Sequence, residues 1–211
     1  MRILYLGLDP SRYQTEGEIT HLPLIHIVPK PFLEVAHLFE KLKNYTHVLF
    51  TSRSAIPPYV EYAFKSGYLL SHLQEKRYLV IGEATSQALL EYQLTPHAIA
   101  TLPTAEGILP LLDSQQVASL FFPHSSLSRP LLKTELISRE IPHLSFPLYD
   151  TQFHKPPLPP LELFEEIVFT SPSTVKAFYQ CTQNLPPLSK CRAIGPITKK
   201  SLEYFWALPY G

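Results

Sequence analysis

The sequence predicts an α/β protein with two related domains, each built on a parallel β-sheet. Three observations lead to this fold class. Short apolar runs alternate with amphipathic segments long enough for helices, a pair of motifs occurs twice in the same order, and 22 prolines stand mostly where these segments end. Because strands covered by helices on both faces are apolar along their length, the runs indicate parallel strands.

The expected strands are short runs rich in β-branched and aromatic residues. They cover residues 3–8, 48–50, 78–81, 98–100, 120–122, 167–169 and 192–194. Between them, apolar positions recur at helical spacing. The expected helices cover residues 32–42, 56–65, 85–92, 105–112, 129–138 and 173–180.

Two parts of the sequence repeat the same motifs. Phe-Thr-Ser at residues 50–52 recurs at 169–171, and Ile-Gly followed by a threonine at 81–85 recurs at 194–198. The extended segments 23–25 and 147–149 also resemble each other. Two copies are too few for a solenoid and indicate a pair of related domains instead.

Both motifs place hydroxyl groups where a strand passes into a helix. A serine or threonine there caps the helix by accepting hydrogen bonds from unpaired backbone N–H groups. In a parallel sheet these turns share the carboxyl edge, where open α/β sheets bind ligands, and a helix N-terminus attracts anions. The motifs alone leave two interpretations open, an anion site or helix caps with no further role.

Composition argues against several classes of function. Lys plus Arg and Asp plus Glu number 18 each, so the formal net charge is zero, which removes the strongest argument for a nucleic-acid partner. No apolar run is long enough to span a membrane, and the one at the amino end is too short for a signal peptide, so we expect a cytoplasmic protein.

Cys181 and Cys191 are expected to be ordinary thiols. The sequence has no HxxxH pair, nucleotide-binding glycine loop or GxSxG motif, so neither a zinc site, a nucleotide site nor a hydrolase is expected.

The ordered motifs resemble those of the uroporphyrinogen-III synthase family. Besides the four repeated turns, the resemblance includes Phe-Phe-Pro at 121–123 with Arg129 downstream, and Pro-Leu-Tyr-Asp-Thr at 147–151. It implies two α/β domains, one inserted in the other, joined by a two-stranded extended linker. The linker segments would cover residues 22–30 and 144–153, the middle domain 31–143, and the terminal domain 1–21 with 154–211.

Two departures from the family pattern affect the terminal domain. Family members usually carry a helix between the first strand and the first linker, but residues 9–20 are polar and not helical in pattern. Relatives also continue past the second Ile-Gly helix with a strand and a helix, whereas this sequence ends at residues 206–211. We therefore expect a reduced terminal domain.

The resemblance also implies a reaction. Hydroxymethylbilane, a linear tetrapyrrole with an acetate and a propionate on every pyrrole, would lose its terminal hydroxyl as water and close into uroporphyrinogen III with ring D inverted. Such a lyase of porphyrin and heme biosynthesis acts mainly by holding its substrate folded. No cofactor, metal, nucleic acid or membrane would take part. The chain would be a monomer that contacts the preceding enzyme of the pathway transiently.

Tyr149 matches a family tyrosine that projects from a linker, and it would assist departure of the substrate hydroxyl. The alternative is a tyrosine packed against a domain edge. The residues expected to bind substrate are Thr51, Ser52, Gly82, Thr85, Ser86, Ser125, Arg129, Thr170, Ser171, Ser173, Gly195 and Thr198. Ile197 stands where many relatives have another threonine. Two alternatives to the enzyme stay open: a non-catalytic two-domain protein that binds anionic small molecules, and a protein that acts through protein contacts.

Overall fold

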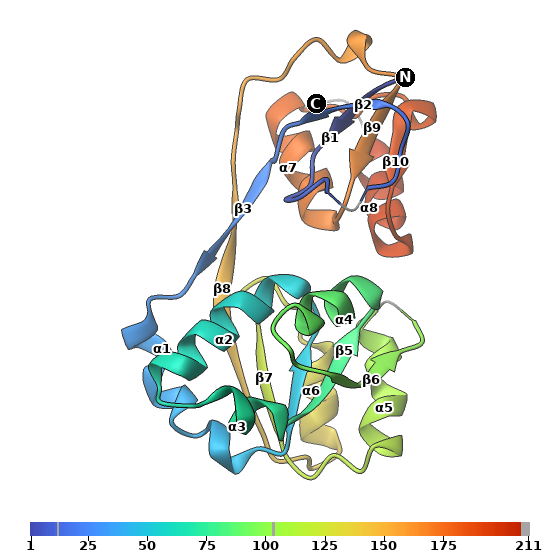
Figure 1. Ribbon diagram of the computed structural model, residues 1–211. Coiled ribbons are helices and arrows are strands. Elements are labelled where there is room, and N and C mark those ends of the chain that lie inside the picture. Colours follow the sequence, from blue (N-terminus) through green and yellow to red (C-terminus); the bar gives the residue numbers. More distant parts are fainter. Residues whose placement is uncertain (12, 103, 208–211) are drawn as a thin grey trace. The chain divides into compact units, whose positions relative to one another are not determined.

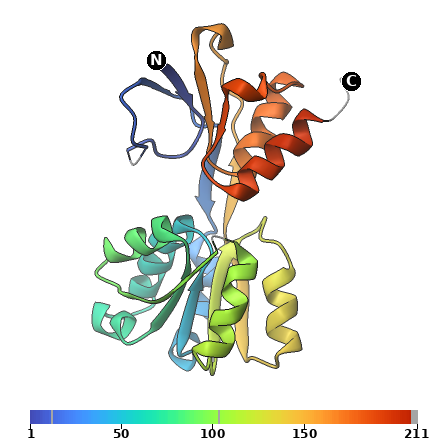
Figure 2. The ribbon, with the colours of Figure 1, turned by 90° about the vertical axis from the view of Figure 1, so that its right-hand side faces the viewer.

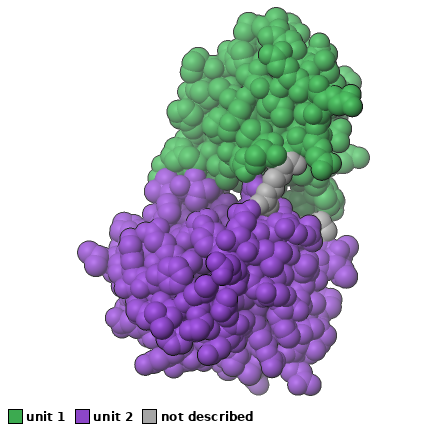
Figure 3. Space-filling view, viewed as in Figure 1, with its two compact units in different colours: residues 1–26, 151–211 green, residues 27–150 purple. Residues whose placement is uncertain are grey.

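The computed structural model describes residues 1–11, 13–102 and 104–207, and the chain divides into two compact units (Figure 1). Unit 1 combines residues 1–26 with 151–211, and unit 2 comprises residues 27–150 (Figure 3). The expectation for the end of the chain falls partly on residues 208–211, which lie outside the described residues.

Unit 1 contains a parallel sheet with the strand order β10-β9-β1-β2. Its strands are β1 (Arg2–Tyr5), β2 (Glu18–His21), β9 (Glu166–Phe169) and β10 (Cys191–Ala193). Helices α7 (Pro172–Thr182) and α8 (Pro196–Trp206) pack against each other and cover one face of this sheet (Figure 2). Each helix begins with a proline, whose fixed φ suits the first turn and whose missing N–H would have no helical partner there.

A loop covers the second face of the unit 1 sheet. Ile3, Tyr5 and Val168 point to this side and are at most 4% exposed. Tyr13 packs on them from the loop, with its ring centroid 5.5 Å from that of Tyr5. Where the structure describes the segment between β1 and β2, it forms no helix, as the polar sequence there predicted.

The larger sheet has the strand order β3-β8-β7-β4-β5-β6, and most of it belongs to unit 2. Its strands are β3 (Ile25–Pro29), β4 (His47–Phe50), β5 (Arg77–Ile81), β6 (Pro96–Ala100), β7 (Leu120–Ser125) and β8 (His143–Phe153). The neighbours from β8 to β6 are all parallel. At the β3 side, the N–H of Lys30 donates a hydrogen bond to the Leu148 carbonyl at 2.8 Å.

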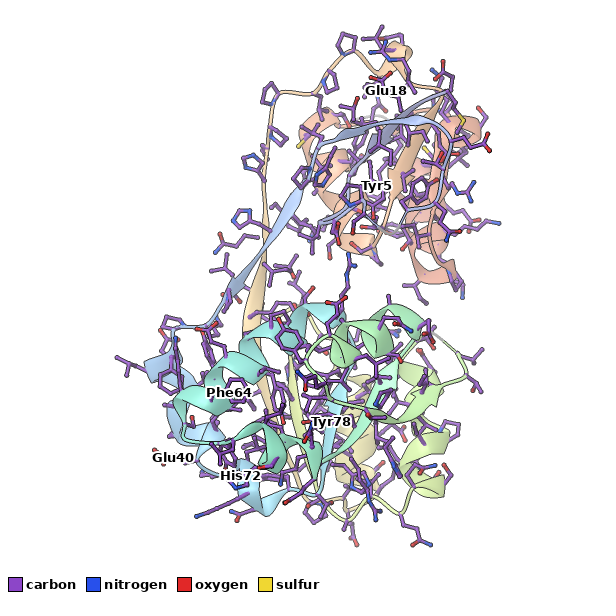
Figure 4. All side chains as sticks on the ribbon, in the orientation of Figure 1. Tyr5, Glu18, Glu40, Phe64, His72 and Tyr78 are labelled. Atoms are coloured by element: carbon purple, nitrogen blue, oxygen red, sulfur yellow. The ribbon has the colours of Figure 1, made fainter. Side chains whose placement is uncertain are left out.

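Helices cover both faces of the unit 2 sheet. One face packs against α1 (Phe32–Phe39), α2 (Ile56–Lys65), α3 (Leu70–Gln74) and α4 (Glu83–Leu90), and the other against α5 (Leu109–Ser114) and α6 (Leu131–Ser138). Aromatic rings fill the first layer. Tyr59 and Tyr78 are completely buried with their hydroxyl oxygens 3.3 Å apart, and Tyr78, inside unit 2, donates to the Leu73 carbonyl at 2.9 Å (Figure 4).

The predicted elements are confirmed with three corrections. Every expected strand overlaps an observed one, but β2 and α3 are missing from the prediction, since one is a polar strand of four residues and the other a helix of five. The expected helix 105–112 is instead a 3-10 turn (Ala105–Ile108) followed by α5. Pro110 explains the break, because a proline cannot donate to the carbonyl four residues earlier and stands in the first turn of α5.

Candidate functional site

The carboxyl edge of the unit 2 sheet brings together three of the predicted residues. Ser52 follows β4, Ser125 ends β7, and Tyr149 lies opposite Ser125 in β8. The strands are neighbours in the order β8-β7-β4, so their ends lie at one edge of the sheet. The side chains of Ser52 and Ser125 both form hydrogen bonds with the Tyr149 side chain.

Tyr149 is 3% exposed and belongs to the aromatic core layer of unit 2. Burial raises the pKa of its phenol, and the hydroxyls of Ser52 and Ser125 offset part of this rise by hydrogen bonding. At neutral pH the phenol therefore carries its proton. The hydroxyl groups of Ser52 and Ser125 can stabilise the phenolate oxygen of Tyr149 after the proton has left, which is an arrangement that suits a general acid.

Ser52 serves both the helix and the tyrosine. Its backbone is extended (φ −156°, ψ 141°), and its Oγ accepts a hydrogen bond from the Ser54 N–H at 3.3 Å, which caps a 3-10 turn (Arg53–Ala55) before α2. The neighbouring Thr51 is partly exposed, as is Ser52. The cap and the contact with Tyr149 therefore share one hydroxyl group.

Ser125 lies in a tight turn at the end of β7. The pairing of β7 with β8 shifts register between His124 and Ser125, and such irregularities re-aim side chains at strand ends. The Oγ of Ser125 accepts the Leu127 N–H at 3.2 Å, and its carbonyl accepts the Ser128 N–H at 2.9 Å. The turn thus fixes the backbone from which the Ser125 hydroxyl reaches Tyr149.

Two ion pairs lie near this edge. Lys30 Nζ is 2.7 Å from Asp150 Oδ2, and hydrogen bonds from Lys30 and Ser126 lower the pKa of the Asp150 carboxyl. Arg129 binds both oxygens of Glu106 at 3.1 Å, which lowers the pKa of Glu106 to about 2. The Arg129–Glu106 pair is exposed, and exposed ion pairs are weak, so the Arg129 guanidinium could bind another carboxylate in place of Glu106.

The turn before α4 turns its hydroxyl groups inward. Gly82 has φ 74°, a conformation that favours glycine, and precedes the helix. Thr85 and Ser86 are 4% and 3% exposed, and their N–H groups both donate to the Gly82 carbonyl at 3.2 Å. Their predicted contact with substrate stays a prediction, and it requires the covering side chains to move.

The repeated turn in unit 1 forms a closed network. Ser171 caps α7, and its Oγ accepts the Thr174 N–H at 3.3 Å. The completely buried Thr174 Oγ1 accepts the N–H groups of Thr170 and Ser171 at 3.2 and 3.1 Å and donates to the Ser171 carbonyl at 2.7 Å. Thr170 packs closely on Gly7, since a Cβ added to Gly7 would lie 2.4 Å from the methyl carbon of Thr170.

Thr174 is a residue that the sequence analysis missed. The signal was present, since a serine followed three residues later by a second hydrogen-bonding residue is the spacing of a capping box. Of the other predicted residues in unit 1, Ser173 is partly exposed, Gly195 has open space where a Cβ would stand, and Thr198 is 4% exposed.

Two surface hollows lie apart from these turns. One of about 660 Å³ is at the amino edge of the unit 2 sheet, and Ser66 contributes to its walls. Glu40 and His72, labelled in Figure 4, line it as well. The other, of about 380 Å³, lies beside β10 and α8 in unit 1. Among the residues with described positions, no three His, Cys, Asp or Glu side chains are grouped as metal ligands, and no helix has the length and apolar character to cross a membrane.

Comparison with known proteins gives a consistent result. The sequence model of a family described as uroporphyrinogen-III synthase HemD matches residues 12–207. A mutant uroporphyrinogen III synthase from the extremely thermophilic bacterium Thermus thermophilus has a similar structure, with a TM-score of 0.66 and 17% identity, covering 99% of this chain and 90% of that one. The synthetase from Helicobacter pylori gives 0.61 and 21%, covering 100% and 92%. No curated protein sequence matches significantly.

Proposed function

The chain belongs to the uroporphyrinogen-III synthase family, and from this premise we propose that it converts hydroxymethylbilane into uroporphyrinogen III with inversion of ring D and loss of water. The family makes it an enzyme of tetrapyrrole biosynthesis. The reaction is that of a cyclising hydro-lyase. The hydrogen-bonded group of Tyr149, Ser52 and Ser125 is the observation that carries the proposal for this chain.

The proposed chemistry starts with departure of the terminal hydroxyl. The C–O bond breaks, the phenol of Tyr149 supplies a proton, and the hydroxyl leaves as water. The proton passes to the substrate either directly or, since Tyr149 is almost completely buried, through the partly exposed hydroxyl of Ser52 or Ser125. The electron-rich pyrroles stabilise the cation that remains, and the tyrosine regains a proton from the ring after closure.

Substrate binding is assigned to the turns at strand ends. The carboxylates of a polyanion suit helix N-termini, each of which contributes about 0.3–1 kcal/mol per nearby charge. Ser52 in unit 2 and Ser171 in unit 1 stand at such termini. This mode of binding needs few cations, which fits the formal net charge of zero.

An isomer assay tests the proposal. We expect purified protein to consume hydroxymethylbilane faster than its spontaneous closure and to yield uroporphyrinogen III. Exclusive formation of the uninverted isomer I at the uncatalysed rate would reject the proposal. Tight binding of the polycarboxylate without turnover would instead identify a non-catalytic binding protein.

A further inference from the structure

His124 lies at the register shift between β7 and β8, next to Ser125. Its half-buried ring lies 4.8 Å from that of Phe122, which belongs to the core layer against α5 and α6. The Ser125 side chain contacts the Tyr149 side chain, which belongs to the core layer on the opposite face of the sheet. The His124 ring and the Tyr149 side chain therefore lie on opposite faces of the sheet.

The hydrogen bonds of His124 determine its tautomer. Nδ1 lies 2.8 Å from the Ser125 carbonyl oxygen, and Nε2 lies 3.0 Å from Ser145 Oγ. A carbonyl oxygen only accepts, so Nδ1 carries the proton and donates it. In the neutral ring Nε2 must accept, and the Ser145 hydroxyl is its donor. Burial and the nearby Lys133 lower the pKa of His124 and so favour this neutral ring.

The two bonds connect the strands that carry the serine and the tyrosine. Ser145 belongs to β8, four residues before Tyr149, and Ser125 is paired with Tyr149 across the register shift. His124 thus joins β8 to the Ser125 carbonyl on one side of the sheet. On the other side, the Ser125 and Tyr149 side chains form their own hydrogen bond.

We propose that His124 is a positioning residue, whose ring, held between Ser145 and the Ser125 carbonyl, sets the Ser125 hydroxyl against the Tyr149 hydroxyl. Its effect on turnover rests on the proposed function. Its effect on the hydrogen bond does not, so the two can be tested separately.

The test compares His124→Leu, which loses both bonds, with His124→Asn, which keeps a donor near the position of Nδ1. The readout is the NMR signal of the Tyr149 ring carbon that bears the oxygen, in protein made with isotope-labelled tyrosine and assigned with Tyr149→Phe. Ser125→Ala gives the signal of a tyrosine without this partner. We expect His124→Leu to move the signal most of the way toward that of Ser125→Ala, and His124→Asn to stay near the parent.

Kinetics give the second readout. If Tyr149 acts as proposed, His124→Leu lowers kcat about tenfold, part of what a general acid contributes, and changes KM less than about twofold. If His124 only supported the fold, its loss would not lower kcat while leaving KM nearly unchanged. If the parent protein shows no synthase activity, the proposed function fails, while the Tyr149 signal still decides the role of His124.

His143→Leu is the matched control. His143 Nδ1 lies 2.8 Å from the Ile141 carbonyl, so this variant loses the same kind of bond at the start of β8, far along the strand from Tyr149. We expect it to leave the Tyr149 signal unmoved. A His124→Leu signal that moves no further than that of His143→Leu would overturn the proposal, and so would a His124→Asn signal displaced as far as that of His124→Leu. If His124→Leu does not fold, Ser145→Ala replaces it, with a smaller shift in the same direction expected and no shift contradicting the proposal.

Discussion

The two Phe-Thr-Ser turns begin alike and end differently. In unit 1 the position three residues after the serine is Thr174, whose buried hydroxyl closes a network around Ser171. In unit 2 the matching position is Ala55, which is equally buried but has no hydroxyl. There Ser52 makes its second contact with Tyr149 from another strand. The comparison indicates that the residue three positions after the serine distinguishes a turn closed within its own segment from one that contacts a side chain of another strand.

The strands that lead into these two turns, β4 and β9, also differ at their amino ends. The first residue of β4 is His47 in unit 2, and the first residue of β9 is Glu166 in unit 1. Glu166 accepts a hydrogen bond from Tyr13 and lies 3.7 Å from Arg192. His47 is 1% exposed, and its Nε2 has no hydrogen-bond partner within the described part of the chain. The ionisable residue at the amino edge therefore has polar partners in unit 1, whereas in unit 2 a positive charge on the buried His47 would be unfavourable.

The largest expected effect is the response of His47 to pH. Burial, with Arg77 and His97 nearby, lowers its pKa from 6.5 to about 4, so below pH 6.5 the unfolded chain takes up a proton that the folded chain refuses. The contribution of His47 to the free energy of unfolding is complete above pH 6.5 and is lost as the pH falls toward 4, by about 3 kcal/mol in total. Urea unfolding across this range should show a slope that His47→Leu flattens and that replacement of the exposed His37 by glutamine leaves in place. An unchanged slope in His47→Leu would contradict this difference between the edges.

Tyr149→Phe tests what distinguishes the carboxyl edges. Loss of the phenolic proton should lower kcat about a hundredfold, at the low end of what general acids contribute. Ring closure after loss of the hydroxyl depends on how the substrate is folded, so the product should still be isomer III. Tyr68→Phe is the control, because the Tyr68 hydroxyl accepts the Lys43 N–H at 2.9 Å at the other edge of unit 2. Equal turnover by both variants would mean that Tyr149 is only a packed tyrosine.

Thr174→Val tests the closed network of unit 1. The variant keeps the shape of the buried side chain but leaves the N–H groups of Thr170 and Ser171 without their acceptor. An unsatisfied buried group costs about 1–3 kcal/mol, so we expect a loss of about 2 kcal/mol in the free energy of unfolding. The NMR signal of Tyr149 should not change. A stability within about 0.5 kcal/mol of the parent would show that water or other groups replace the hydroxyl.

The smallest effects come from removing the two capping hydroxyls. Ser171→Ala should cost about 1 kcal/mol of stability, a usual value for an N-cap. Ser52→Ala should cost less, because its cap bond serves a short 3-10 turn and Ser171 caps an α-helix, but it should move the Tyr149 NMR signal. If Ser171→Ala moved that signal as much as Ser52→Ala, the two turns would not be specialised as we infer.

The sequence predicted the sheets well because their strands are apolar and repeat the same motifs. It missed β2, whose residues Glu18–His21 lack the apolar pattern and become a strand only by pairing with β1. It also placed Ser125 and Tyr149 in the candidate site. Their hydrogen bond, however, depends on a register shift between distant segments, which no local pattern reveals. The inward orientation of Thr85 and Ser86 is likewise a result of packing, since their motif looks like that of an exposed cap.

A ligand titration followed by backbone NMR tests most directly the claim that the carboxyl-edge turns bind the substrate. Uroporphyrinogen III, kept reduced, serves as the probe. We predict that the amide signals of Ser54 and Leu127 in unit 2 and of Thr174 in unit 1 shift together as the ligand is added, while those of His47 and Arg77 at the amino edge stay in place. Shifts confined to the amino edge, in a protein that still makes isomer III, would contradict the account.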